Sequence, residues 1–191
     1  RNFLWKLTHN CLKIGSYWKK IPGYEQHGEC EHCQQTNSIS HILFECPQNH
    51  GERLWTITKG LCDQRKIPWP VNLDILYIMT APIIEIKAAS GQSKVGETRL
   101  FCIVVLECAW QLWKARCHRV MNPDRPQTTY KEVKNSLKAG LNDKLHQDIA
   151  LTNQNKYGHK ALPPKLVLHT WSGNLQNEES QPDNWLSSSG D

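Results

Sequence analysis

Four potential metal ligands lie close together in the sequence and constrain the fold of this chain more than any other feature. Cys30, Cys33, His41 and Cys46 form the pattern C-x2-C-x7-H-x4-C. A structural Zn²⁺ site has four tetrahedral ligands drawn from thiolates and neutral imidazoles, and a two-residue gap lets two cysteines converge on one ion through a tight turn. The spacing therefore predicts one structural zinc ion bound by these four residues.

The residues around these ligands suit such a site. Segment 28–33 can form the tight turn that brings the first two cysteines together. Asn37 or Ser38 can cap a short helix that presents His41. Because a residue before proline avoids the helical conformation, Pro47 is expected to turn the last cysteine back toward the metal. Three thiolates and one imidazole leave no open position for water, so we expect a structural and not a catalytic ion.

Other interpretations of the cysteines stay open at the level of sequence. Cys30 and Cys33 could form a redox pair, although that chemistry needs a βαβ context and no alternating strand pattern flanks them. The ligands could also be scattered thiols in a cysteine-rich chain, because further cysteines lie outside the pattern: Cys11, Cys62, Cys102, Cys108 and Cys117. Four ligands at usable spacing nevertheless favour a metal site over both.

The histidine ligand also has neighbours that could replace it. His27, His32 and His50 all lie near the pattern. His32 is confined between the first two cysteines, and His50 lies beyond Pro47. These positions favour His41 as the fourth ligand.

Length and composition set wider limits. With 191 residues and 39% hydrophobic content, the chain can bury one modest core. It has no apolar run of about 18 residues and no secretory signal, so we expect no membrane span, reduced cysteines and an intracellular location, cytoplasmic or nuclear. Because the chain begins at Arg1 and continues directly into an apolar periodic segment, we expect that it was cut from a larger polypeptide.

Charge is divided unevenly along the chain. Residues 171–191 carry Glu178, Glu179, Asp183 and Asp191 without any Lys or Arg, so the net charge of +5 separates into +9 for residues 1–170 and −4 for the tail. A basic excess of this size raises the expectation of anionic partners such as nucleic acid, although solvated lysines are a common alternative.

Apolar periodicity predicts a mainly α protein: a small zinc-stabilised helical module, then long packed helices, then a disordered acidic C-terminal tail. Thr128 or Thr129 is the expected cap of the last long helix. The expected helices are residues 2–14, 49–62, 74–79, 94–121 and 130–150. The expected units are a zinc-binding module (1–66), a helical region with a long Trp-bearing helix (67–152) and a tail (153–191).

The tryptophans divide into groups. Trp18 lies beside Lys19 and Lys20 and could be exposed. Trp171 and Trp185 in the polar tail are either anchors of short binding motifs or without a role, and we expect that they have no role. The tryptophans on apolar helix faces should belong to the core: Trp5, Trp55, Trp110 and Trp113.

The acidic residues do not suggest an active site. Polymerases and RNases H hold two Mg²⁺ ions with clustered carboxylates, but the Asp and Glu residues of this chain are dispersed. Asp74 and Glu97 have the positions of helix-start residues, and Glu107 is expected on an exposed helix face. Glycine-rich phosphate loops and GxSxG elbows are absent from the sequence. We therefore expect no enzymatic activity and no small-molecule substrate.

The sequence also resembles a known family. Residues 3–10 (FLWKLTHN), the ligand pattern and residues 41–47 (HILFECP) resemble the CCHC zinc-binding segment that follows the reverse transcriptase, and often an RNase H domain, in non-LTR retrotransposon polyproteins. Residues 110–117 (WQLWKARC) resemble the helix after that segment in fungal members. The resemblance covers about residues 1–122 and implies a nucleic-acid-associated module with the polymerase and RNase H domains upstream. The gap before the histidine is longer than in a retroviral zinc knuckle.

Two function classes follow. The first is a zinc module that binds RNA or DNA, in which basic residues contact phosphates and Tyr17, Trp18 or Tyr24 stack on unpaired bases. The second is a structural module, in which the zinc-pinned helices dock within the polyprotein or on a protein partner without binding nucleic acid. The candidate nucleic-acid residues are Lys6, Lys13, Trp18, Lys19, Lys20, Arg53, Lys59, Arg65 and Lys66.

Overall fold

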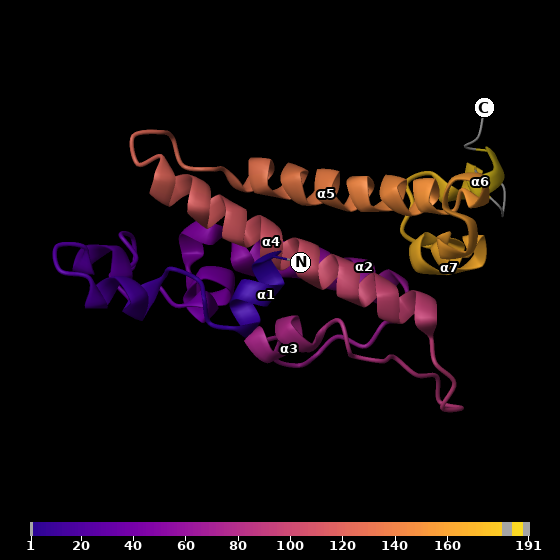
Figure 1. Cartoon of the computed structure of the whole chain (residues 1–191), viewed down its shortest axis with the longest axis horizontal. Helices are drawn as coiled ribbons and strands as arrows, with labels where there is room; N and C mark the ends of the chain where they lie inside the picture. Colours follow the sequence, from indigo (N-terminus) through magenta and orange to yellow (C-terminus); the bar gives the residue numbers. More distant parts are fainter. Residues whose placement is uncertain (1, 181–184, 189–191) are drawn as a thin grey trace.

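The computed structural model describes residues 2–180 and 185–188 and confirms the predicted mainly α class (Figure 1). Within these residues the only β pairing is two isolated antiparallel bridges, Glu29 with Thr36 and Lys87 with Ser93. The α-helices are α1 (Asn2–Thr8), α2 (Gly51–Gln64), α3 (Ile75–Thr80), α4 (Val95–Met121), α5 (Tyr130–Leu151), α6 (Gln154–Tyr157) and α7 (Pro164–Trp171). Arg1, Pro182, Asp183 and Asp191 lie outside the described residues.

Helix α4 is the centre of the molecule, because α2, α5 and α7 all pack against it (Figure 1). A helix that is apolar on most sides must be buried on most sides. Its fully buried side chains include Leu100, Val104, Val105 and Leu112. The buried residues form one hydrophobic cluster, which contains residues from all three predicted units: 1–66, 67–152 and 153–191.

Glu107 of α4 is buried, so the prediction of an exposed Glu107 is wrong. Its carboxylate accepts a hydrogen bond from the Gln111 amide at 2.6 Å, and both side chains face α5. They fit there because Gly140 of α5 has no side chain: a Cβ at Gly140 would meet the Glu107 carboxylate and lie 2.9 Å from the Gln111 amide nitrogen. Helical spacing alone did not reveal this close approach of two helices.

Local capping signals place several helix starts where the sequence predicts them. Thr129 caps α5, and Glu132 completes a capping box by accepting a hydrogen bond from the Thr129 backbone N–H at 2.6 Å. The Asp74 carboxylate caps α3 by accepting from the Tyr77 N–H at 3.1 Å. Glu97 lies in the first turn of α4, as expected of a helix-start residue.

The first helix ends earlier than predicted, at Thr8 and not at residue 14. Asn10 adopts a left-handed backbone conformation with φ 50°, and the Cys11 N–H donates to the Lys6 carbonyl at 2.8 Å. A left-handed residue of this kind ends a helix. Leu12 lies beyond that turn and is buried. The apolar residues after Thr8 are therefore explained by tertiary packing and not by a longer helix.

The structure also differs from the expected disordered tail over residues 153–180. Helix α7 begins at Pro164, a favourable first position, and buries Val167 and Trp171 against α4 and α5. The Trp171 indole donates to the Asp148 carboxylate at 2.7 Å. Trp185 is buried as well. The expectation that Trp171 and Trp185 have no role is therefore wrong, and the short apolar pattern of residues 166–171 was the missed signal.

Two of the four tryptophans predicted for the core are exposed. Trp55 is buried and Trp113 is half-buried, but Trp5 is 56% exposed and Trp110 is 38% exposed. Phe3 of α1 packs against both Trp110 and Trp113, with its ring 5.7 and 5.8 Å from theirs. Trp5 stacks instead on His9 at 4.4 Å.

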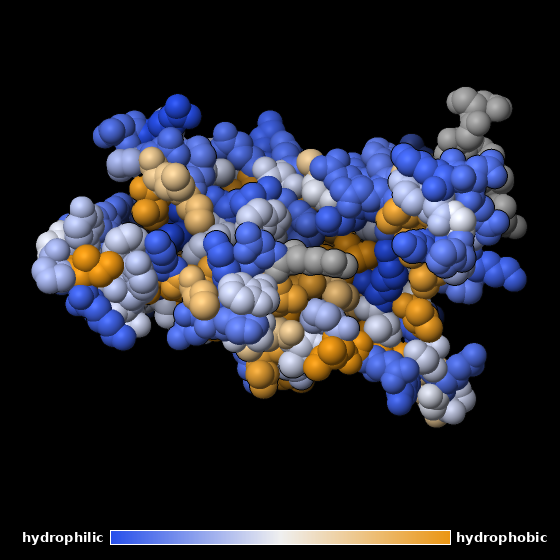
Figure 2. All heavy atoms as spheres, viewed as in Figure 1, coloured by the Kyte–Doolittle hydropathy of each residue, from blue (hydrophilic) through white to orange (hydrophobic). Residues whose placement is uncertain are grey.

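The surface is largely hydrophilic, with apolar residues gathered near α3 (Figure 2). Leu76 of α3 and the nearby Ile83 are mostly exposed. In the part of the chain that the structure describes, every helix is too short or too polar to cross a membrane.

Candidate metal centre

Cys30, Cys33, His41 and Cys46 come together at one point of the fold. Their candidate ligand atoms all lie within 4.8 Å of one another. The Sγ atom of Cys46 lies 3.8 Å from that of Cys30 and 4.0 Å from that of Cys33. A disulfide needs about 2.05 Å between its sulfurs, so these thiols are not bridged to one another. The predicted ligand set is therefore assembled and could bind one metal ion.

The first two cysteines are held by a tight hairpin. The Cys30 N–H donates to the Gln35 carbonyl at 2.8 Å, and the Gln34 N–H donates back to the Cys30 carbonyl at 2.7 Å. Gln34 adopts a left-handed conformation with φ 53°, which lets the chain reverse within a few residues. This hairpin is the turn that the two-residue gap predicts.

The second pair of ligands comes from a short π-helical turn, His41–Glu45. The Ser38 hydroxyl accepts from the His41 N–H at 3.0 Å, which confirms Ser38 as the capping residue. The Cys46 N–H donates to the His41 carbonyl at 2.8 Å, and Cys46 itself is extended with ψ 114°. Pro47 imposes this exit from the helix, so the last cysteine turns toward the other ligands as expected.

Several buried contacts fix the histidine segment to the helical core. The Asn49 amide donates to the Ile42 carbonyl at 2.7 Å and accepts from Arg119 of α4 at 2.6 Å. The Trp55 indole of α2 donates to the Leu43 carbonyl at 2.9 Å. The metal-binding segment is therefore anchored on both α2 and α4.

The surroundings of the His41 ring suit a metal ligand. The ring is only 2% exposed, and neither ring nitrogen has a hydrogen-bond partner in the protein. Glu45 is the nearest carboxylate, at 3.8 Å from Nδ1, which is too long for a hydrogen bond. An unsatisfied buried polar group costs about 1–3 kcal/mol. A metal ion among the thiols would satisfy one of these nitrogens.

The pKa values of the Cys30 and Cys46 thiols are shifted in opposite directions. Burial raises the pKa of Cys30, but the adjacent His41 side chain and hydrogen bonds from nearby backbone N–H groups lower it to about 7. Burial raises the pKa of Cys46 to about 11, and the neighbouring Cys30 contributes to this rise. Cys30 therefore ionises more readily than Cys46, whose deprotonation would be favoured by a nearby cation. A divalent metal ion is such a cation.

Two arginines of α4 line a small cleft beside Cys30. Arg116 is only 7% exposed, its Nε has no hydrogen-bond partner, and burial lowers its pKa while the charges of Cys117 and Cys30 raise it. Arg119 lies near enough to Cys46 to lower the pKa of that thiol. Three thiolates around a divalent ion carry one net negative charge, which these guanidinium groups would offset. Sequence reasoning missed both arginines, because they lie far along the chain from the ligands.

The alternative histidines serve other contacts. The ring of His50 lies 3.2 Å from the Thr128 carbonyl, His32 contacts Gln127 at 3.1 Å, and His27 stacks on Tyr24. Among the described residues, His41 is the histidine of the candidate metal group.

Four of the candidate nucleic-acid residues gather beside the metal centre. Trp18 lies in the 3₁₀ helix η1 (Gly15–Lys20), which packs on η2 (Glu25–Gly28). Its ring lies 5.2 Å from that of Tyr17, 6.2 Å from that of Tyr24 and 5.6 Å from that of His27. We call this group of four rings the aromatic cluster. Its cationic neighbours are Lys13, Lys19 and Lys20, all exposed.

Part of this surface is already engaged within the protein. Lys13 lies 5.6 Å from the Tyr17 ring centroid, and Lys19 pairs with Glu29 at 3.3 Å. The Trp18 indole N–H donates to the Lys13 carbonyl at 2.8 Å, which fixes the ring in place and leaves it half-exposed.

The other candidate residues are not brought to this surface. Arg53 stacks on the Tyr130 ring at 3.5 Å, and Lys59 pairs with Asp63 at 2.6 Å. Arg65 is half-buried and donates to the carbonyls of Ser172 and His169, so it ties α2 to the C-terminal segment. Lys6 and Lys66 are exposed, and Lys6 lines a cleft with Trp110 and Trp113.

No protein-family model, curated protein or solved structure matches this chain. What the fold and the site define is a mainly α-helical protein with a Cys₃His cluster that could bind one metal ion.

Proposed function

We propose that this chain is a non-catalytic zinc-binding module of a retrotransposon-derived polyprotein and that it contributes to RNA or DNA binding. The choice of zinc is supported by the geometry of the thiols. With Zn–S bonds of about 2.3 Å, two sulfurs at the corners of a tetrahedron lie about 3.8 Å apart. The separations of 3.8 and 4.0 Å from the Cys46 sulfur match that edge.

The proposed role of the ion is structural. Cys₃His ligation fills all four tetrahedral positions and leaves none for water or substrate. The ion would join the hairpin of Cys30 and Cys33 to the turn of His41 and Cys46, which otherwise share few hydrogen bonds. When bound to the four ligands, the ion would hold the aromatic cluster next to the helical core.

The aromatic cluster and its lysines are the observation that carries the nucleic-acid proposal. Proteins that bind single strands without sequence preference combine cations for the phosphates with aromatic faces on which bases stack. Trp18 is fixed by its indole hydrogen bond and remains half-exposed beside Lys19 and Lys20. Such a rigid ring loses little conformational entropy when a base stacks on it.

The sequence resemblance supports the same proposal from a different direction. Residues 3–10, the ligand pattern and residues 41–47 resemble the segment that follows the reverse transcriptase in non-LTR retrotransposons, and residues 110–117 resemble the helix after it in fungal members. A module in that position would work beside a polymerase acting on RNA and DNA. Those upstream domains are the protein partners that we propose.

Salt-dependent binding of a single-stranded RNA by the zinc-loaded protein tests the proposal. If about four to six cations contact phosphates, log affinity should fall against log salt with a slope of about −3 to −4. The double variant Lys19→Ala, Lys20→Ala should flatten the slope by about one to two units. Trp18→Ala should weaken binding by about 1–3 kcal/mol without changing the slope.

The double variant Lys156→Ala, Lys160→Ala is a matched control. Both lysines are exposed and lie near α6, at the opposite end of the molecule from η1 and η2 (Figure 1). The control should leave the slope unchanged if contact is local to the aromatic cluster. An equal effect of both double variants would reject a specific surface.

A purely structural docking module is the second candidate function. The exposed apolar side chains Leu76 and Ile83, together with the almost fully exposed Val71, favour it because such groups mark protein interaction surfaces. Absence of binding to single- or double-stranded RNA or DNA at low salt, by folded zinc-loaded protein, would make this the better proposal.

A further inference from the structure

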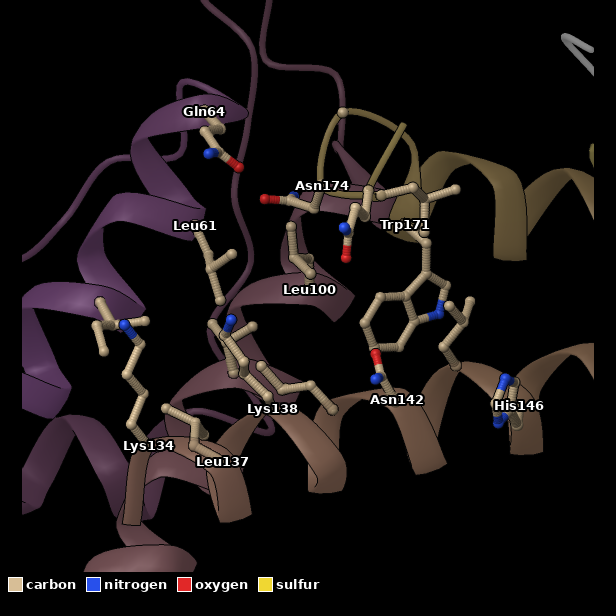
Figure 3. A pocket seen from close by; sticks show the side chains of 17 residues that line it. Leu61, Gln64, Leu100, Lys134, Leu137, Lys138, Asn142, His146, Trp171 and Asn174 are labelled. Atoms are coloured by element: carbon tan, nitrogen blue, oxygen red, sulfur yellow. The ribbon is translucent and has the colours of Figure 1, made fainter. Parts of the chain in front are cut away.

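A cavity of about 640 Å³ lies between α2, α4 and α5 and is covered by residues 171–176 (Figure 3). Its volume falls within the range of about 300–1,000 Å³ typical of small-molecule sites. In Figure 3, Leu61 of α2, Leu100 of α4 and Leu137 of α5 surround one space, with Trp171 to their right. The cavity lies in a part of the fold that the metal centre and the aromatic cluster do not use.

The walls of this cavity are apolar. Helix α2 contributes Ile57 and Leu61, one helical turn apart on the same face. Helix α5 contributes Leu137, Leu141 and Leu145 with the same spacing. The last two leucines and both α2 residues are only half-buried, so apolar surface remains open to an occupant.

The rim of the cavity is cationic and rich in amides. Lys134, Lys138 and His146 of α5 lie along it, and none of the lining residues is acidic. The Asn174 amide adds an unsatisfied group, because its nitrogen and oxygen are both buried without a hydrogen-bond partner. An anionic occupant would complement the lysines, and a polar head could satisfy the amide.

Size distinguishes a single-chain ligand from a docked helix. A helix is about 10–12 Å across and rises about 1.5 Å per residue, so a segment matching residues 134–146 would occupy on the order of 1,700 Å³. A single alkyl chain is much narrower than a helix and fits a cavity of about 640 Å³.

We propose that this cavity binds a single-chain anionic amphiphile such as a fatty carboxylate. The alkyl chain lies against the leucines of α2, α4 and α5, and the carboxylate lies at the rim near Lys134 and Lys138. This ligand is bound and not transformed, so the proposal is independent of the proposed nucleic-acid function.

The probe is dodecanoate, used below its micelle concentration. Its binding is measured by calorimetry and by displacement of an anilinonaphthalene sulfonate dye. The full-length zinc-loaded chain should bind about one equivalent. Leu141→Phe, which fills part of the cavity while keeping the wall apolar, should abolish binding. Circular dichroism and retained zinc verify that this variant is folded.

A lysine pair tests the anionic head separately. Lys134→Gln, Lys138→Gln should weaken dodecanoate binding about tenfold and leave binding of uncharged dodecanol unchanged. Lys131→Gln, Lys144→Gln is the matched control, because these lysines lie on the same helix outside the cavity lining. Equal loss in both pairs would overturn the assignment of the head group.

The remaining outcomes overturn the proposal. Dodecanoate binding that persists unchanged in folded Leu141→Phe would place the ligand elsewhere. Binding of a helical leucine–glutamate peptide, blocked by Leu141→Phe, without any binding of dodecanoate, would identify the cavity as a helix-docking site.

Discussion

At the scale of single residues, the metal centre depends on side chains from distant parts of the chain. The ligands lie within one short segment, whereas Arg116 and Arg119, which line a cleft beside Cys30, come from α4. The ligands make the site possible and the arginines set its charge balance.

Replacing Cys30 and Cys33 together by serine should remove the metal, because two of four ligands are lost. Protein purified under reducing conditions should hold about one equivalent of zinc before the change and almost none after it, as measured by elemental analysis. Cys11→Ser, at an exposed cysteine outside the cluster, is the control and should keep its zinc. Full retention in the double variant would refute the ligand assignment.

Chelating the metal should unfold residues 24–50 locally. Structural zinc contributes on the order of 10 kcal/mol in small zinc-binding peptides, and its loss leaves several buried polar groups unsatisfied. Hydrogen exchange should then accelerate in this segment while the amides around Val104 of α4 stay protected, since that part of the helix is in the hydrophobic core. Uniform acceleration across both regions would instead show that the metal supports the whole fold.

Arg116→Gln should lower zinc affinity by about 10- to 100-fold, the range observed for groups that support metal ligands from outside the coordination shell. A buried guanidinium offsets the negative charge of three thiolates, so its removal makes the loaded centre less stable. Competition with a chromophoric chelator measures the change, and Arg116→Lys should recover part of the affinity. Arg125→Gln, at an exposed site beyond α4, is the control. An unchanged zinc affinity in folded Arg116→Gln would exclude this role.

At the scale of elements, glycines at helix contacts decide how closely the helices pack. Gly96 of α4 lies against the backbone of α7, where a Cβ would come within 2.6 Å of the His169 carbonyl carbon. Gly60 of α2 has no atom within 4 Å of the corresponding position. The same substitution therefore has opposite consequences at the two glycines.

Gly96→Ala should destabilise the protein by about 1–3 kcal/mol, because backbone atoms must move to accommodate the new methyl group. Gly60→Ala should stabilise it by about 0.5–1 kcal/mol, because alanine is favoured in a helix interior. Urea unfolding of the two variants gives both values. Equal effects would contradict the close packing of α7 on α4.

At the scale of the whole molecule, one buried carboxylate joins α4, α5 and the C-terminal segment. Asp148 of α5 is buried and accepts hydrogen bonds from Arg99 of α4 at 2.6 Å and from Trp171 of α7 at 2.7 Å. Three elements that are far apart in sequence therefore meet at a single carboxylate.

Asp148→Ala should cost about 3 kcal/mol of unfolding free energy, because it removes the carboxylate partner of the partly buried Arg99 guanidinium and leaves the Trp171 indole N–H without a partner. Asp143→Ala, at an exposed position of the same helix, should change stability by less than about 0.5 kcal/mol. Thermal or urea unfolding measures both. A small effect of Asp148→Ala would mean that α7 is held mainly by its apolar face.

The sequence by itself determined the features that depend on neighbouring residues. The spacing of the cysteines and His41, the Ser38 and Thr129 caps and the long apolar period of α4 all act within a few residues or one helical face. These features depend on local backbone geometry, so the structure contains them nearly as the sequence predicts.

Only the tertiary structure decided which faces meet. The burial of Glu107, the exposure of Trp5, the ordered packing of Trp171 and the approach of Arg116 to the thiols all depend on contacts between segments that are distant in sequence. Periodicity shows that a helix has an apolar face, but not which helix will cover it or how completely. That choice is made by packing, through the glycines that allow close approach and the buried polar groups that must find partners.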